Sequence, residues 1–215
     1  MKGTTRRLRG GSISPHICAL IDRTSGGRAQ RRPEEKRARL LAAARTAFGA
    51  TGYGASVHEI CQAAGVGIGT FYHQFPDKSD LMRFFMDEEH QYRVRAFDTL
   101  ATDSGDAFSA ELVRILAGSD PALLRAMIEA CGIDDRLREF GRSVRKETRE
   151  RLAAALARAR EARNIRRPAL DSSTAAWATL EMGDRSTDPT GTLAFEKAVA
   201  VLVFAETDGA GHTRA

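Results

Sequence analysis

The residues best suited to contact another molecule lie between positions 67 and 78. Gly67 and Gly69 leave almost no side-chain bulk at the start of this segment, so its backbone can approach a surface closely. If a helix begins there, its free N–H groups point outward and favour anions. Such groups suit phosphate oxygens and base edges in the major groove of DNA. Together with one residue that precedes the segment, the candidate DNA-contacting residues are Ser56, Gly67, Ile68, Gly69, Thr70, Tyr72, His73 and Lys78.

Two short helices are predicted to position these residues. Ser56 and Glu59 have the spacing of a capping box, which predicts a helix that starts directly after Ser56. This helix is expected to end at Gly65, since glycine tolerates the left-handed conformation of a sharp exit. A second helix is predicted from about 67 to 73, and Pro76 turns the chain after it. Two short helices joined by a tight turn that contains glycine form a helix-turn-helix.

Helical patterns also occupy the rest of the chain. One helix is predicted to start at Pro33, and a longer one is predicted from Lys78 to about Leu100. Further helices are predicted at 106–117, 121–131, 133–163, 170–182 and 192–206. The sequence therefore predicts an all-α protein, with a three-helix lobe over residues 33–80 that contains the helix-turn-helix and a second helical lobe over residues 81–207.

The helix-turn-helix resembles the DNA-binding signature of TetR/AcrR-type transcriptional regulators. The matching stretch is AAGVGIGTFYHQFPDKSDL, and the resemblance covers about residues 34–81. The residues that fit the family pattern are Ser56, Ile60, Gly65, Val66, Gly69, Thr70, Tyr72, Phe75, Lys78 and Leu81.

This resemblance implies a function and an assembly. It implies a homodimer that binds double-stranded operator DNA, most simply as a repressor. An unidentified small-molecule effector would release this dimer from the DNA. Residues 33–80 would bind DNA, and residues 81–207 would bind the effector and the second subunit. DNA and effector would select different spacings of the two recognition helices, with reciprocal coupling. Two alternatives stay open: a helix-turn-helix regulator controlled by a protein partner or by no ligand, and an enzyme that carries a helix-turn-helix module.

The second lobe offers candidate ligand contacts. Trp177 and Glu181 are four residues apart and share a face of a predicted helix, where they could stack on and orient a polar or cationic ligand. Core packing or a dimer contact is an equal interpretation for Trp177, and a solvated or ion-paired carboxylate is an alternative for Glu181. The apolar candidates for a pocket lining are Phe108, Leu112, Met127, Cys131 and Phe140.

The last predicted helix carries more apolar residues than a terminal helix usually needs. Such a surplus marks either an internal core or a subunit interface. TetR-like proteins pair through their last two helices, so the resemblance favours the interface. The predicted dimer contacts are Leu193, Phe195, Val199, Leu202 and Val203.

Charge is distributed unevenly along the chain. Residues 1–32 contain eight of the 33 Lys and Arg residues and one of the 28 Asp and Glu residues, so residues 33–215 have a net charge of −2. This composition predicts a disordered basic extension over residues 1–32, and residues 208–215 are predicted to be a flexible tail. Arg31 and Arg32 would either enter the minor groove as a basic arm or remain solvated.

Several other classes of protein do not fit the sequence. Cys18, Cys61 and Cys131 are scattered without metal-ligand spacing, which indicates a reduced, cytoplasmic protein with no metal or cofactor site. No apolar run approaches the roughly 20 residues of a membrane helix. Nucleotide-binding and hydrolase motifs are absent. The S-x-x-K pattern that starts at Ser143 has no companion motif, so the chain is not predicted to be an enzyme.

Overall fold

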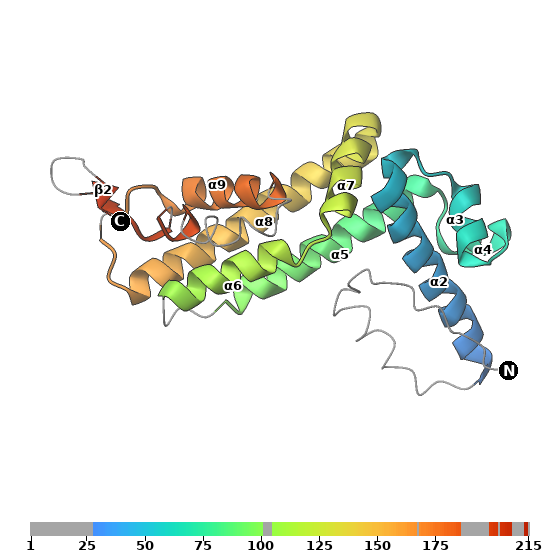
Figure 1. Ribbon diagram of the computed structural model, residues 1–215, viewed down its shortest axis with the longest axis horizontal. Helices are drawn as coiled ribbons and strands as arrows, with labels where there is room; N and C mark the ends of the chain where they lie inside the picture. Colours follow the sequence, from blue (N-terminus) through green and yellow to red (C-terminus); the bar gives the residue numbers. More distant parts are fainter. Residues whose placement is uncertain are drawn as a thin grey trace, which may run out of the picture.

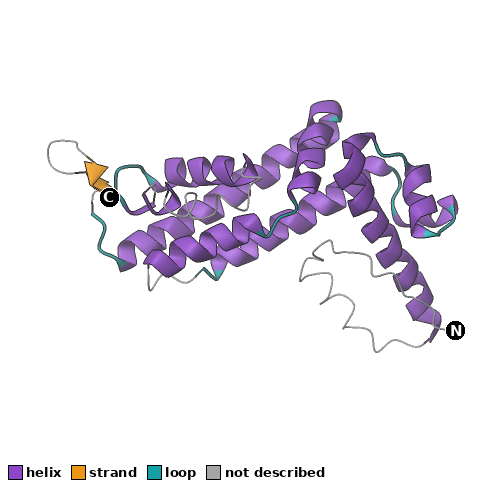
Figure 2. Ribbon diagram, in the orientation of Figure 1, coloured by secondary structure: helices purple, strands orange, loops and turns teal. Residues whose placement is uncertain are grey.

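The computed structural model describes residues 28–100, 105–166, 168–185, 198–201, 203–207 and 213–214. The described chain is almost entirely helical, which confirms the predicted all-α fold (Figures 1 and 2). Its elements are α2 (Arg28–Thr51), the 3-10 turn η1 (Gly52–Gly54), α3 (Val57–Ala64), α4 (Ile68–Gln74), α5 (Lys78–Asp98), α6 (Gly105–Ala117), α7 (Pro121–Ile133), α8 (Asp135–Ala162), α9 (Ser172–Arg185), β1 (Glu206–Thr207) and β2 (Thr213–Arg214). No helix within these described ranges is both long and apolar enough to cross a membrane.

The helix-turn-helix forms as its sequence predicts. The backbone N–H of Glu59 donates to Ser56 Oγ at 3.2 Å, and the backbone N–H of Ser56 donates to Glu59 Oε2 at 2.9 Å, which completes the capping box. Gly65 ends α3 with φ 62° and ψ 40°, a left-handed conformation that favours glycine. Gly67 then caps α4, so α3 and α4 are joined by three residues.

Helix α2 begins five residues earlier than predicted. It starts at Arg28, so Pro33 lies inside the helix and residues 28–32, predicted to be disordered, have helical backbone. Proline at this position removes only the hydrogen bond to the carbonyl of Ala29. That carbonyl lies in the first turn, where a helix tolerates the loss best.

Helices α5 and α8 run side by side along the molecule, with α6 and α9 beside them and α7 crossing towards α2 (Figure 1). The first core joins α2, α3 and α4 to the start of α5, to α7 and to the start of α8, so it crosses the predicted lobe boundary at residue 80. Its largest fully buried members are Leu40, Phe48, Ile60, Phe71, Leu81, Met82, Phe85 and Leu137. The second core lies between the end of α5, α6, the end of α8, α9 and the last described helical residues.

Two predicted boundaries in the second lobe are wrong. The helix predicted from Ile133 begins at Asp135, because Asp134 caps it by accepting from the backbone N–H of Arg136 at 2.8 Å. Ile133 instead ends α7 and is 67% exposed. Its four-residue spacing from Leu137 therefore spans a break between helices and does not reflect one continuous apolar stripe.

The C-terminal residues contain a strand pair that was not predicted. Glu206 lies opposite Arg214 and Thr207 opposite Thr213 in an antiparallel ladder. The predicted helix end at residue 206 is therefore wrong, and Thr213 and Arg214 have strand backbone within the predicted flexible tail. Asp208 and Gly209 are a hairpin-turn signal in the sequence that lies between the two strands.

Candidate functional site

Helix α4 presents one face to solvent and buries the other. Phe71 is fully buried, whereas Ile68 is 49% and Tyr72 is 55% exposed. A Cβ added at Gly67 or Gly69 would meet no atom within 4 Å. The outward face of α4 is therefore open and slender at its N-terminal end, as a helix that enters the major groove requires.

The other candidate DNA-contacting residues differ in how exposed their side chains are and in whether they already form hydrogen bonds within the chain. His73 is exposed and Thr70 is half-buried. Ser56 is exposed, but its hydroxyl is already used by Glu59, whose Oε2 accepts from it at 2.8 Å. The helical backbone of α2 includes Arg31 and Arg32, whose side chains lie outside the described residues. DNA contacts of all these residues remain predictions.

Lys78 has two partners within the chain. Its Nζ donates to the carbonyl of Tyr53 at 2.7 Å and lies 4.3 Å from the centre of the Tyr53 ring. The side chain is half-buried and holds the η1 turn against the start of α5. Lys78 is therefore a structural residue of the DNA-binding lobe in addition to the phosphate contact that we predict for it.

Lys78→Ala should consequently lower both stability and DNA affinity. Loss of the hydrogen bond and of the cation–π contact should reduce the free energy of unfolding by about 1–2 kcal/mol. Loss of a phosphate contact should flatten the salt dependence of DNA binding by about one charge. Urea unfolding and operator titrations at several salt concentrations measure the two effects; an unchanged midpoint of unfolding would contradict the structural role.

Two arginines of α2, which the sequence did not single out as candidate site residues, lie against the helix-turn-helix. Arg37 Nη1 donates to Gln74 Oε1 at 2.7 Å, and its guanidinium lies over the rings of Phe75 and Phe84. Arg39 lies beside the turn of the helix-turn-helix, where a Cβ on Gly65 would be 3.7 Å from its Nη1. The signal available in the sequence was that both residues lie off the buried stripe of α2.

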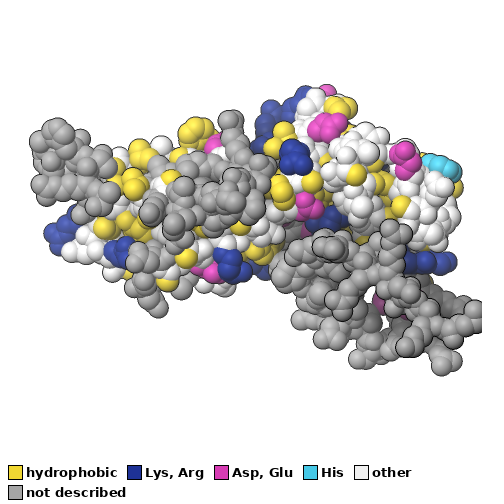
Figure 3. Space-filling view, viewed as in Figure 1, with side chains coloured by type: hydrophobic (Ala, Val, Ile, Leu, Met, Phe, Trp, Pro, Cys, Tyr) yellow, Lys and Arg dark blue, Asp and Glu magenta, His cyan; other side chains and the backbone are white. Residues whose placement is uncertain are grey.

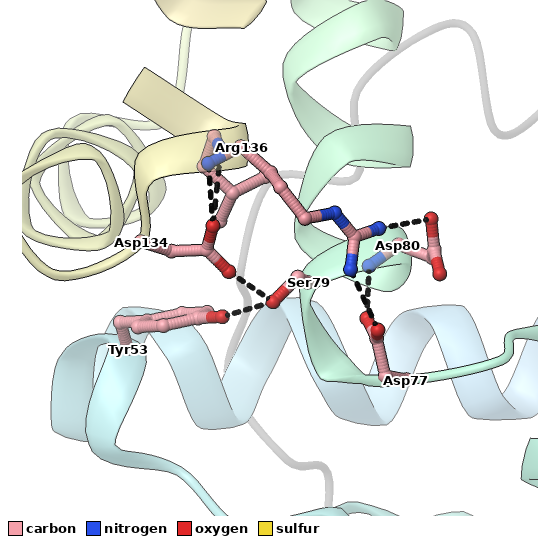
Figure 4. Close-up of polar contacts among 7 residues, drawn as sticks. Tyr53, Asp77, Ser79, Asp80, Asp134 and Arg136 are labelled. Carbon is pink, nitrogen blue, oxygen red and sulfur yellow. Dashed lines mark hydrogen bonds and ion pairs between the residues drawn. The ribbon is translucent and has the colours of Figure 1, made fainter. Parts of the chain in front are cut away.

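A polar junction connects the helix-turn-helix to the second lobe, formed by Tyr53, Asp77, Ser79, Asp80, Asp134 and Arg136 (Figure 4). The Tyr53 hydroxyl lies 2.9 Å from Ser79 Oγ, and the Ser79 hydroxyl donates to Asp134. Arg136 donates to Asp77 at 2.9 Å and to Asp80 at 3.2 Å. These contacts link η1 and the start of α5 to Asp134, which lies between α7 and α8, and to Arg136 at the start of α8.

The junction depends on the charge of Asp134. The Ser79 hydroxyl, followed by the backbone N–H groups that Asp134 caps, holds the pKa of this carboxyl below its ordinary value of 3.8. A carboxyl with a lowered pKa stabilises the fold above its ordinary pKa and loses that contribution as acid protonates it. Asp134 is therefore ionised at neutral pH.

A pocket of about 90 Å³ lies between α5, α7 and α8. Each helix contributes four residues at the spacing i, i+3, i+4 and i+7, which is one helix face. The lining residues are Met86, Glu89, His90 and Arg93 from α5, Leu124, Met127, Ile128 and Cys131 from α7, and Gly141, Val144, Arg145 and Thr148 from α8.

The pocket includes two of the seven residues that we predict to contact a ligand. Met127 and Cys131 line it, whereas Phe108 and Leu112 are buried in the second core. Phe140 packs against the first core without lining the pocket. Trp177 is 53% exposed on α9, Glu181 is half-buried on the same helix, and neither residue lines the pocket.

The predicted dimer residues also require a correction. Val199 and Val203 are fully buried in the second core of a single chain, so they have no surface left for a partner. Leu193 and Phe195, as well as the side chain of Leu202, lie outside the described residues. The apolar surplus of the last helix therefore fills the internal core at the two positions that the structure describes.

Comparisons with known proteins agree with this fold. A model of bacterial regulatory proteins of the tetR family matches residues 40–83, which span the second half of α2, the helix-turn-helix and the start of α5. No curated protein matches the chain.

Three solved structures have a similar fold. The TetR-family regulator PfmR from Thermus thermophilus has a TM-score of 0.61 at 21% identity, over 76% of this chain and 96% of that chain. A tetR-family regulatory protein from Rhodococcus RHA1 has a TM-score of 0.64 at 21% identity, over 80% and 98% of the two chains. The fatty acid degradation regulator FadR from Bacillus halodurans has a TM-score of 0.63 at 22% identity, over 89% and 100%. The chain therefore contains a segment that matches the tetR-family model and includes the helix-turn-helix described above, and over most of its length it is similar in fold to TetR-family transcriptional regulators.

Proposed function

We propose that the protein is a homodimeric repressor that binds operator DNA through α4 and is released when a small molecule occupies the pocket between α5, α7 and α8. The observation that carries this proposal is that the pocket-lining helices α5 and α8 also contribute Ser79, Asp80 and Arg136 to the polar junction, and that Asp134 of the junction directly follows the third pocket helix, α7. A ligand that moves these helices apart also moves the groups that hold the helix-turn-helix in place.

The distances along the chain between pocket and junction are short. On α5, Ser79 of the junction precedes Met86 of the pocket by two turns. On α7, Cys131 of the pocket is followed three residues later by Asp134, and on α8 Arg136 precedes Gly141 by five residues. Because helices move as nearly rigid bodies, a shift at the pocket is transmitted to Asp134 and Arg136. Ligand and DNA would then select different positions of the DNA-binding lobe.

The exposed face of α9 supports the proposed homodimer. Trp177 on α9 is 53% exposed and Val201 in the last described helical segment is 45% exposed. Both segments bury their opposite faces in the second core, through Ala176 and Val199 respectively. Exposed tryptophan is a common anchor of protein interfaces. We therefore propose Trp177 and Val201 as interface residues in place of Val199 and Val203.

Filling the pocket should mimic the effector. A Cβ at Gly141 would lie 2.8 Å from Cys131 Sγ and 3.1 Å from Met86 Cε, so Gly141→Ala requires these side chains or α8 itself to shift and fills part of the pocket. We expect Gly141→Ala to weaken operator binding by about fivefold or more, the usual range of allosteric coupling. Fluorescence anisotropy with labelled operator DNA measures this change.

Gly132→Ala is the matched control. Gly132 is an exposed residue of α7, and a Cβ there would meet no atom within 4 Å. This variant should bind operator DNA as the wild-type protein does. Circular dichroism establishes that both variants are folded; equal operator affinity of the two folded variants would contradict control through the pocket.

A further inference from the structure

The pocket has an apolar floor. Six of its lining side chains are apolar or carry a sulfur atom: Met86, Leu124, Met127, Ile128, Cys131 and Val144. Burial raises the pKa of the Cys131 thiol, so the thiol is neutral at pH 7 and donates to the carbonyl of Leu137 at 3.4 Å. The floor therefore suits the apolar part of a ligand.

The charges around the pocket are unbalanced. Glu89 is the one carboxylate among the described residues that line it. Its Oε1 accepts from Arg93 Nε at 2.7 Å and from the Ser119 hydroxyl, so Glu89 and Arg93 offset each other. Arg145 is different, because it makes no hydrogen bond or ion pair with any residue that the structure describes. An uncompensated guanidinium therefore faces the pocket. Figure 3 shows Lys and Arg side chains near the meeting of α7 and α8, with Asp and Glu side chains beside them.

Arg145 lies close to the apolar floor. The position of a Cβ on Gly141 would be 3.8 Å from Arg145 Nη2, 2.8 Å from Cys131 Sγ and 3.1 Å from Met86 Cε. The guanidinium and the two sulfur-bearing side chains therefore lie close together beside Gly141, which has no side chain to fill the space. Such an arrangement favours a molecule with an anionic end and an apolar end.

His90 adds a second hydrogen-bond donor to the wall of the pocket. The ring is buried, and its Nε2 lies 3.0 Å from a carboxylate oxygen of Glu147. Because an ionised carboxylate only accepts hydrogen bonds, Nε2 carries a hydrogen. A ligand carboxylate can take the place of this partially exposed Glu147 side chain at the imidazole.

We propose that the pocket binds a short-chain carboxylate, with its head group at Arg145 and its apolar chain against Met86, Met127 and Cys131. The proposal rests on the ligand control proposed above and names the class of ligand. Arg binds carboxylates through two parallel hydrogen bonds, which gives strength and orientation. The pocket volume of about 90 Å³ is below the roughly 150 Å³ of an apolar cavity that holds benzene, so the apolar chain should have fewer carbons than benzene, about three to five in addition to the carboxylate carbon.

Calorimetry on the full-length protein with matched six-carbon probes tests the ligand class. Hexanoate should bind about tenfold or more tightly than hexanol or hexylamine, which share its chain but lack the carboxylate. Arg145→Gln should weaken hexanoate binding by about tenfold and leave hexanol binding unchanged. Arg142→Gln is the control, because Arg142 is paired with Glu139 on the same helix and does not line the pocket; this variant should bind hexanoate as the wild-type protein does.

Three results would overturn the proposal: hexylamine that binds as tightly as hexanoate, unchanged hexanoate binding by Arg145→Gln, or no binding by any of the three probes. Operator release is measured separately, so that the two proposals can fail independently. Hexanoate that binds through Arg145 but leaves the operator complex intact supports the ligand class and contradicts ligand control. Hexylamine that releases operator DNA, with hexanoate inactive, supports ligand control and overturns the ligand class.

Discussion

Gly69→Asp should abolish operator binding without destabilising the protein. Gly69 is the second residue of α4, where an acidic side chain interacts favourably with the positive end of the helix. A Cβ there meets no atom within 4 Å, so the fold accommodates the change. In a major groove the same carboxylate would face phosphates and base edges, and such like-charge contacts cost several kcal/mol. We expect a loss of operator affinity of roughly a hundredfold or more, measured by anisotropy.

Gly69→Ala separates the effect of charge from the effect of size. This variant adds the Cβ but no charge, so its operator affinity should lie between those of the wild-type protein and Gly69→Asp. Thermal melting should give similar midpoints for all three proteins. If Gly69→Asp binds operator DNA normally, the outward face of α4 is not the DNA-binding surface.

Trp177→Glu should yield folded monomers that bind operator DNA weakly. The side chain is 53% exposed in a single chain, so a charge there leaves the second core intact. In the proposed dimer the same charge would be buried without a partner in an apolar interface, and truncation of such an anchor costs about 2 kcal/mol or more. Loss of the second half-site contact should then lower operator affinity by about two orders of magnitude. Analytical ultracentrifugation and operator titration measure the two effects.

Ile133→Glu is the matched control for the dimer prediction. Ile133 is 67% exposed on α7, so the substitution places the same charge at an exposed apolar position on another face. This variant should remain dimeric and should bind operator DNA. A dimeric Trp177→Glu protein, by contrast, would place the subunit interface elsewhere.

The helix-turn-helix was predictable because its signals are local. Ser56 and Glu59 satisfy each other across one turn, and Gly65 ends α3 in a conformation that other residues adopt only with strain. Each signal acts within a few residues, so the sequence alone contains the needed information. The start of α2 is the exception, since Pro33 is compatible both with a first helical position and with the second turn of a longer helix.

The pocket and the exposed face of α9 were less predictable because they depend on how helices are rotated against one another. His90 and Arg145 belong to polar stretches, and their sequence pattern predicts that they are exposed to solvent. Both residues nevertheless line the pocket, because α5 and α8 turn these faces towards α7. On α9 the small residues Ala175 and Ala176 are buried, while the large Trp177 points outward. Small residues allow helices to approach closely, so the largest apolar side chain did not mark the buried face.

The first core limits which segments of this protein can be recombined with those of related proteins. Gly49 of α2 lies 3.5 Å from Ala122 of α7, measured from its ideal Cβ position, and the carboxylate of Glu129 on α7 accepts from the backbone N–H of Tyr53 at 3.0 Å. The same carboxylate lies so close to Gly52 that there is no room for a side chain at this position. A chimera joined at residue 80 would therefore separate α2 and η1 from the surface on which they pack. The unit that recombination can transfer intact includes α7 as well as the helix-turn-helix, although 46 residues of sequence separate the end of α4 from the start of α7.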